Sequence, residues 1–122
     1  MSAFRAISIN VHSAVEVVAA PLLLIAPFVL GFSIAAGVVS IALGILLIGL
    51  GLSLHGGEAD RGSLPLHAHA GFDYALAAIT IVLGTIVGFA ADDPAAGIFM
   101  VGFGSAHLAL SASTRYSRPL GA

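Results

Sequence analysis

Two histidine–carboxylate pairs are the residues of this sequence whose types and spacing could do chemistry. His12 precedes Glu16 by four positions, and His69 precedes Asp73 by the same interval. Residues four apart lie one turn above each other on one face of a helix. If the two faces meet, two imidazoles and two carboxylates come together as a donor set for Zn²⁺, Fe²⁺ or Mn²⁺. The chain has no cysteine, which excludes thiolate ligands and disulfides.

Several interpretations of these pairs are open. The four side chains could form a structural clamp, in which each histidine contacts a carboxylate and joins two parts of the fold. They could bind a divalent metal ion, or the histidines could be axial ligands of a haem. Both histidines are also expected within about one turn of a helix start, where four independent side chains could extend toward the lipid headgroups.

The other histidines carry separate expectations. His107 falls late in an apolar stretch with no histidine at the equivalent position elsewhere in the chain. We expect it either to make a packed hydrogen bond between helices or to act as a cofactor ligand. His55 and His67 flank a polar segment, and we expect them to be solvated loop residues.

The composition is that of a membrane protein. Of the 122 residues, 59% are hydrophobic and only 8% are charged. A soluble domain averages about 25% charged residues, so a soluble globular domain is excluded. Four Lys and Arg residues against six Asp and Glu residues leave no basic patch for nucleic acid. We therefore expect the bilayer to be the chain's main partner.

Four apolar stretches are long enough to cross a bilayer as helices, which takes about 20 residues each. They run over about residues 11–30, 35–54, 67–90 and 95–113. Ser8 or Asn10 can cap the first helix, and Asp93 followed by Pro94 is a strong start signal for the fourth. The predicted fold is therefore an all-α polytopic membrane protein with four transmembrane helices.

The cations predict the orientation in the membrane. Arg5 precedes the first span, Arg61 lies between the second and third, and Arg115 and Arg118 follow the fourth. With four spans these segments share one side, and the other side carries no cation. The positive-inside rule then places both termini in the cytoplasm and the chain in the inner (plasma) membrane, with the first span retained rather than cleaved as a signal peptide.

The sequence contains an internal duplication. A shift of 57 residues places His12 on His69 and Glu16 on Asp73, and a shift of 60 then places Gly44 on Gly104. The single membrane domain thus consists of two copies of a helical hairpin, over about residues 8–55 and 64–115. Because each copy has an even number of spans, the copies are expected to run parallel about an axis along the membrane normal.

Two further patterns concern the packing of the helices. Pro21 and Pro27 lie inside the first span, where each removes a backbone donor and should free the carbonyl four residues earlier, at Val17 and Leu23. Small residues four apart allow close helix approach. Such pairs are Ser40 with Gly44, Gly84 with Gly88, and Gly102 with Ala106.

These features resemble the SPW-repeat membrane proteins, a family named for a Ser-Pro-Trp motif in each hairpin. The first copy reads Ala26-Pro27-Phe28 and then Gly31-Phe32, after the His-x-x-x-Glu unit. The second copy has Leu64-Pro65-Leu66 before His69 and keeps Gly88-Phe89. The resemblance implies a small bacterial four-helix membrane protein. It implies no chemical activity.

Three function classes follow from the sequence. The first is a non-enzymatic structural or accessory membrane protein, as a homo-oligomer or a subunit of a larger complex. The second is a metal- or haem-binding protein of redox chemistry that uses the two pairs and His107. The third is a small proton-coupled exporter, because four spans with a glutamate in the first resemble the small multidrug resistance transporters. No nucleophile triad, phosphate-binding loop or dinucleotide motif is present, so we do not expect an enzyme.

Overall fold

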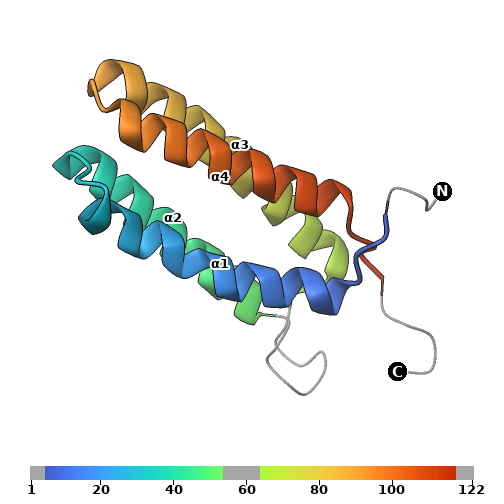
Figure 1. The fold of residues 1–122 in the computed structure, drawn as a ribbon. Helices are drawn as coiled ribbons and strands as arrows, with labels where there is room; N and C mark the ends of the chain where they lie inside the picture. The colour runs from blue at the N-terminus through green and yellow to red at the C-terminus, as the bar shows by residue number, and fades with distance from the viewer. Residues whose placement is uncertain (1–4, 54–63, 118–122) are drawn as a thin grey trace.

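Four helices form the structure, a computed structural model that describes residues 5–53 and 64–117. They are α1 (Ile9–Val29), α2 (Ile34–Leu52), α3 (Leu66–Ala90) and α4 (Pro94–Ala112). Helices α1 and α2 form one antiparallel hairpin, α3 and α4 form another, and both hairpins begin at the same end of the bundle (Figure 1). All four helices are long and apolar enough to cross a membrane, and their bounds lie within two residues of the predicted spans.

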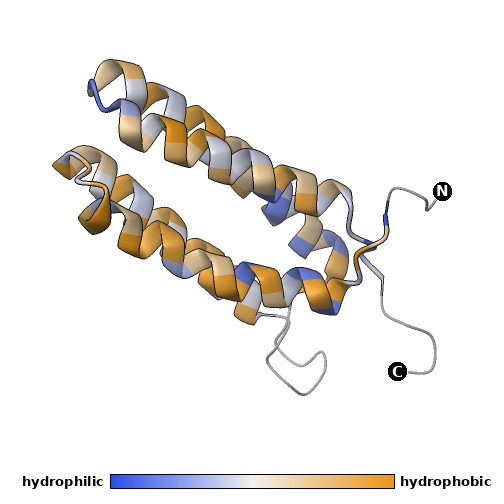
Figure 2. Cartoon of the chain, in the orientation of Figure 1, coloured by the Kyte–Doolittle hydropathy of each residue, from blue (hydrophilic) through white to orange (hydrophobic). Residues whose placement is uncertain are grey.

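The outer surface of the bundle is apolar along most of its length. Large hydrophobic side chains point outward from every helix, and Ile34 and Phe89 are 87% and 85% exposed. Figure 2 shows hydrophobic residues around both hairpins, with the strongly hydrophilic ones gathered toward the ends. Monomeric soluble proteins rarely expose apolar patches of this extent, so this surface faces lipid and the chain is a multi-pass membrane protein.

Side-chain caps begin three of the helices. The Ser8 hydroxyl accepts a hydrogen bond from the Val11 N–H at the start of α1, so Ser8 rather than Asn10 is the cap. The Ser33 hydroxyl caps α2 in the same way. The Asp93 carboxylate accepts from the Ala96 N–H at 3.2 Å, and Pro94 occupies the first position of α4, as the sequence predicts.

Asp93 also joins the two hairpins at their connecting-loop end. Its Oδ2 accepts a hydrogen bond of 2.7 Å from the backbone N–H of Ser33, which begins α2 in the other hairpin. The backbone N–H groups of Ser33 and Ala96 both stabilise the charged carboxylate, and they hold the pKa of Asp93 below its usual range. One carboxylate therefore caps α4 and links it to the start of α2.

We expect Asp93→Ala to lower the melting temperature in detergent at pH 7. The lowered pKa means that the carboxylate stabilises the fold fully above its ordinary value of 3.8 and loses this effect as the pH falls through the folded-state value. The difference in melting temperature between wild type and variant should therefore shrink in acid. A difference that stays constant from neutral pH to below pH 3.8 would contradict this role for Asp93.

The Leu23 carbonyl, which Pro27 leaves without a backbone donor, accepts a hydrogen bond from a side chain. Pro27 has no N–H to offer the Leu23 carbonyl, and the Ser40 hydroxyl of α2 donates to that carbonyl at 2.6 Å. In lipid a freed carbonyl needs a partner inside the protein, and a serine of a neighbouring helix can supply it. The bond therefore ties α1 to α2 in the middle of the first hairpin.

Both hairpins bury the same positions of the predicted repeat. Ala20 and its counterpart Ala77 are buried, as are Gly44 and Gly104. The caps also correspond, because a shift of 60 places Ser33 on Asp93. At these positions the two hairpins bury corresponding residues, although their capping chemistry differs.

Small residues allow the closest helix contacts. A Cβ atom built on Gly97 would lie 2.8 Å from the Cα of Gly88, so α3 and α4 touch backbone to backbone there. A Cβ on Gly84 would lie equally close to the Met100 side chain. By contrast, Gly102 is exposed, and a Cβ atom built on it would have no neighbour within 4 Å. The Gly102 and Ala106 pair therefore does not mediate packing within the described chain.

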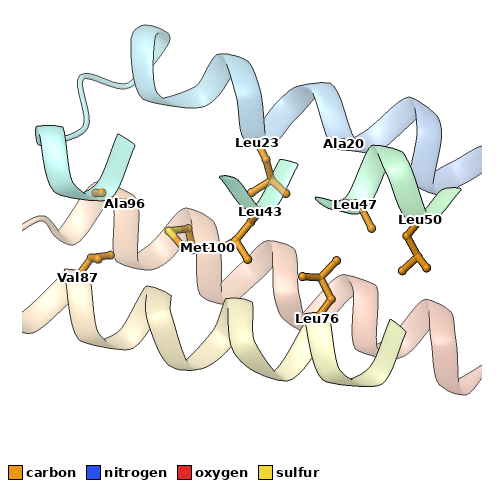
Figure 3. Packing of buried hydrophobic residues seen from close by; sticks show 10 residues of the cluster. Ala20, Leu23, Leu43, Leu47, Leu50, Leu76, Val87, Ala96 and Met100 are labelled. Carbon is orange, nitrogen blue, oxygen red and sulfur yellow. The ribbon is translucent and has the colours of Figure 1, made fainter. Parts of the chain in front are cut away.

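A leucine-rich core fills the space between the hairpins (Figure 3). Leu43, Leu47 and Leu50 of α2 lie against Leu76 of α3 and Met100 of α4. Contacts between the hairpins are nevertheless far fewer than contacts within each hairpin. Polar links at the two ends of this interface therefore matter for how the hairpins are held together.

Candidate metal centre

Five ionisable side chains from three helices meet at the terminal end of the bundle. They are His12 and Glu16 of α1, His69 and Asp73 of α3, and His107 of α4, and all five are buried. The two predicted pairs therefore face each other across the interface between the hairpins. His107 joins them from the second helix of the second hairpin.

His12 lies between both carboxylates. Its Nε2 is 3.0 Å from Glu16 Oε2 in its own helix and 2.9 Å from Asp73 Oδ2 across the interface. His69 repeats the arrangement with longer distances, 3.3 Å to Glu16 Oε1 and 3.4 Å to Asp73 Oδ2. The prediction that each histidine contacts a carboxylate is confirmed. Because both histidines are 0% exposed, the alternative of side chains extending to the headgroups is wrong.

His107 is the third imidazole of the cluster. Its Nε2 lies 3.0 Å from Glu16 Oε2 and 3.5 Å from Asp73 Oδ1. Three Nε2 atoms thus converge on two carboxylates. The sequence indicated that His107 was either a packed hydrogen-bonding residue or a ligand, but its partners lie 91 and 34 positions away along the chain and could not be named.

The Nδ1 atom of His12 has a fixed partner on the far side of the ring. It lies 2.8 Å from the Thr114 hydroxyl, which itself donates to the Leu110 carbonyl at 2.6 Å. Since the hydroxyl proton is used on Leu110, the Thr114 oxygen must accept a proton from Nδ1, an assignment that rests on the hydrogen-bond network. The Nε2 atom that faces the carboxylates is then free to bind a metal or to carry a second proton.

His69 has the same kind of support from the other hairpin. Its Nδ1 lies 3.4 Å from the Ser53 hydroxyl, which donates to the Leu50 carbonyl at 2.6 Å. Each pair's histidine thus contacts a hydroxyl at the end of the opposite hairpin, and the carbonyls that receive the hydroxyl protons belong to Leu50 and Leu110, which correspond in the predicted repeat. Sequence reasoning missed Ser53 and Thr114. The available signal was the presence of hydroxyl residues at the end of the second span of each copy, Ser53 in the first copy and Ser113 with Thr114 in the second.

One carboxylate oxygen of Asp73 accepts a hydrogen bond, and the other has no hydrogen-bond partner among the described residues. The Tyr116 hydroxyl donates to Oδ2 at 2.7 Å, while Oδ1 is buried without a hydrogen-bond partner among the described residues. Burial raises the pKa of Tyr116, and the neighbouring Asp73 carboxylate adds to this, so Tyr116 stays a neutral donor. The remaining oxygen of Asp73 is available to a further ligand.

The two chain ends close the bundle over this cluster. The Ile7 N–H donates to the Ser113 carbonyl at 3.0 Å, and the Arg115 N–H donates back to the Ile7 carbonyl at 2.9 Å. This short parallel bridge holds Thr114 beneath His12. The Arg115 guanidinium also donates to the Arg5 carbonyl at 3.1 Å, so both described arginines lie at the same end of the bundle.

The cluster has the dimensions and the donors of a metal site. One donor atom each from His12, Glu16, Asp73 and His107 lies within 4.8 Å of all the others. Ligands at about 2.0–2.2 Å from a common ion are separated by at most about 4.4 Å, so a small contraction suffices. Imidazole nitrogens with carboxylate oxygens suit Zn²⁺, Fe²⁺ or Mn²⁺. Two carboxylates also neutralise a divalent ion while the imidazoles remain neutral.

Comparisons with protein-family models, with curated proteins and with solved structures find no match to this chain. The resemblance to the SPW-repeat proteins therefore depends on the motifs alone and stays a prediction. Of the two remaining histidines, His67 is exposed as predicted, but it lies in the first turn of α3 rather than in a loop. His55 lies outside the described residues.

Proposed function

We propose that this membrane protein binds a divalent transition-metal ion in the His/carboxylate cluster. The observation that carries the proposal is the convergence of three Nε2 atoms, from His12, His69 and His107, on two buried carboxylates. The hydroxyl contacts at Nδ1 of His12 and His69 support it, because a metal-binding histidine is usually oriented by a hydrogen bond from its other ring nitrogen.

Charge balance favours a metal ion over a purely ionic clamp. Without a metal, the two buried carboxylates need added protons on the facing imidazoles to avoid uncompensated charge. A divalent ion supplies the same two positive charges and uses the Nε2 lone pairs directly. The ion would also bind Asp73 Oδ1, which is buried without a hydrogen-bond partner among the described residues. The cluster would still link the hairpins, so the metal and clamp interpretations are compatible.

A haem has less support at this site. The cavity beside Glu16 and His107 has a volume of only about 100 Å³, which is far too small for a porphyrin. The rings of His12 and His107 are also close, with centroids 6.3 Å apart, and both Nε2 atoms point at Glu16 rather than across an open slot. We therefore propose a single ion, held in a protein that could serve as a homo-oligomer or as an accessory subunit.

Metal analysis tests this function. Protein purified in detergent and dialysed against Fe²⁺, Mn²⁺ or Zn²⁺ should retain about one ion per chain for at least one of these metals. The double variant Glu16→Gln with Asp73→Asn should retain none, because it removes both anionic ligands. Wild-type protein that holds no more metal than the double variant would reject the proposal.

We further propose that both termini face the cytoplasm of a bacterial inner membrane. Arg5 and Arg115 at one end of the bundle, with Asp92 and Asp93 at the other, support this orientation. The chain has no native cysteine, so single cysteines can report it. Ala91→Cys should react with an impermeant thiol reagent added outside intact cells, and Ser117→Cys only after lysis. The opposite pattern would invert the topology.

A further inference from the structure

A cavity beside the cluster lies between α1 and α4. Its volume is about 100 Å³, and Glu16 and His107 are its only ionisable lining residues. The remaining walls are apolar, and they include the lipid-facing Val15 and Ala106 at the rim. We propose that this cavity admits a small uncharged molecule from the bilayer and places it against the metal held by the cluster, an inference that rests on the proposed function.

The repeat makes this cavity specific to one side of the bundle. The equivalent side, between α2 and α3, carries an apolar groove in which Phe72 and Leu76 stand where α1 has Val15 and Ala19. No residue lining that groove is ionisable among the described residues. His107 contributes to the difference, since its counterpart in the first copy is Leu47. Within the described chain, ionisable residues therefore line the cavity on the α1–α4 side but not the groove on the α2–α3 side.

The size and lining of the cavity define the class of ligand. A dry cavity of about 150 Å³ accommodates benzene, so one of this volume takes a molecule of only a few atoms. Apolar walls penalise a charged ligand, which would lose its hydration on the way from the bilayer to the metal. A diatomic molecule that dissolves in lipid, such as oxygen or nitric oxide, meets both conditions.

In contrast to the lipid-facing side, the end of the cluster nearest the aqueous phase is covered by other residues of the chain. The Tyr116 ring packs against His12, with centroids 5.4 Å apart, and its hydroxyl is bonded to Asp73. The Ile7–Thr114 bridge adds a second layer at the same end. The four donors that lie within reach of one ion, from His12, Glu16, Asp73 and His107, leave positions of an octahedral metal open, and the cavity meets the cluster at Glu16 and His107.

The test uses the full-length protein in detergent, loaded with Fe²⁺ under anaerobic conditions. The probe is nitric oxide, which is small and uncharged and gives a characteristic electron paramagnetic resonance signal when it binds Fe²⁺. We expect a signal that accounts for the bound iron. Thiocyanate, a permanent anion, should not prevent nitric oxide from binding.

Two variants test whether nitric oxide reaches the metal through this cavity. Ala19→Leu and Ala106→Leu each add three carbon atoms to the cavity and should slow nitric oxide binding about tenfold or more, with unchanged iron content. Ala109→Leu is the matched control, since Ala109 is exposed on α4 and does not line the cavity, and it should behave as wild type.

The outcomes separate this inference from the proposed function. Iron-loaded wild type that gives no nitric oxide signal would overturn the inference and leave the metal site standing. Equal binding rates in wild type, Ala19→Leu and Ala106→Leu would overturn the lateral route. Protein that binds no iron, manganese or zinc at all would overturn the proposed function, and this inference with it.

Discussion

Glu16→Ala is expected to lower the free energy of unfolding in detergent by about 3–5 kcal/mol, the cost of breaking a buried ion pair by removing one partner. Glu16 is 1% exposed and lies 3.0–3.3 Å from the Nε2 atoms of His12, His69 and His107. Its removal leaves three imidazoles with one carboxylate at the interface between the hairpins. Thermal and denaturant unfolding, followed by circular dichroism, would measure the loss.

The energetic effects of Glu16 and Asp73 are expected to depend on each other. Asp73→Ala should cost a similar amount, and the double variant should lose clearly less than the sum, because both residues serve the same imidazoles. Asp92→Asn is the matched control: Asp92 is an exposed loop carboxylate with a positive φ of 52°, which asparagine tolerates. If Glu16→Ala unfolded like Asp92→Asn, the cluster would have no role in holding the hairpins together.

Metal binding is expected to stabilise the fold by a comparable amount. An ion present at 100 times its dissociation constant adds about 2.7 kcal/mol to the free energy of unfolding, provided that it binds the folded state alone. Melting curves recorded with added metal and then with a chelator would show the shift. Unchanged melting on chelation of a metal-loaded sample would reject the metal site and leave only the clamp.

Thr114→Val separates metal binding from general stability. It removes the acceptor that orients His12 while it keeps the shape of the side chain, and such losses typically weaken metal affinity 10- to 100-fold. Thr85→Val is the control, because Thr85 makes the same type of bond to a carbonyl four residues back, on the exposed face of α3. Equal metal affinities for the two variants would show that the Nδ1 contact does not tune the site.

The sequence predicts the helices well because bilayer thickness fixes their length. An apolar run of about 20 residues has little freedom in lipid, and the capping chemistry of Asp93 and Pro94 marks the boundary closely. The two His/carboxylate pairs could also be recognised, since spacing and duplication together predict that they face each other. These inferences need only local periodicity and one symmetry.

The remaining features depend on contacts that no local pattern encodes. Ser53 and Thr114 act on histidines of the opposite hairpin, and Asp93 reaches the Ser33 backbone across the interface. His107 breaks the repeat, so the symmetry that identified the two pairs could not indicate its partners. His107 also lines the cavity on the α1–α4 side. The repeat therefore predicts four of the five cluster residues, and His107 is the one that it does not predict.

X-ray absorption at the edge of the bound metal tests the central claim most directly. We expect nitrogen and oxygen atoms alone at about 2.0–2.2 Å from the metal, with scattering from several imidazole rings at longer distances. His107→Leu, which installs the residue of the equivalent position in the first copy, should reduce the imidazole contribution by one ring. A spectrum without imidazole scattering, or one that His107→Leu leaves unchanged, would contradict a metal centre built by the three converging histidines.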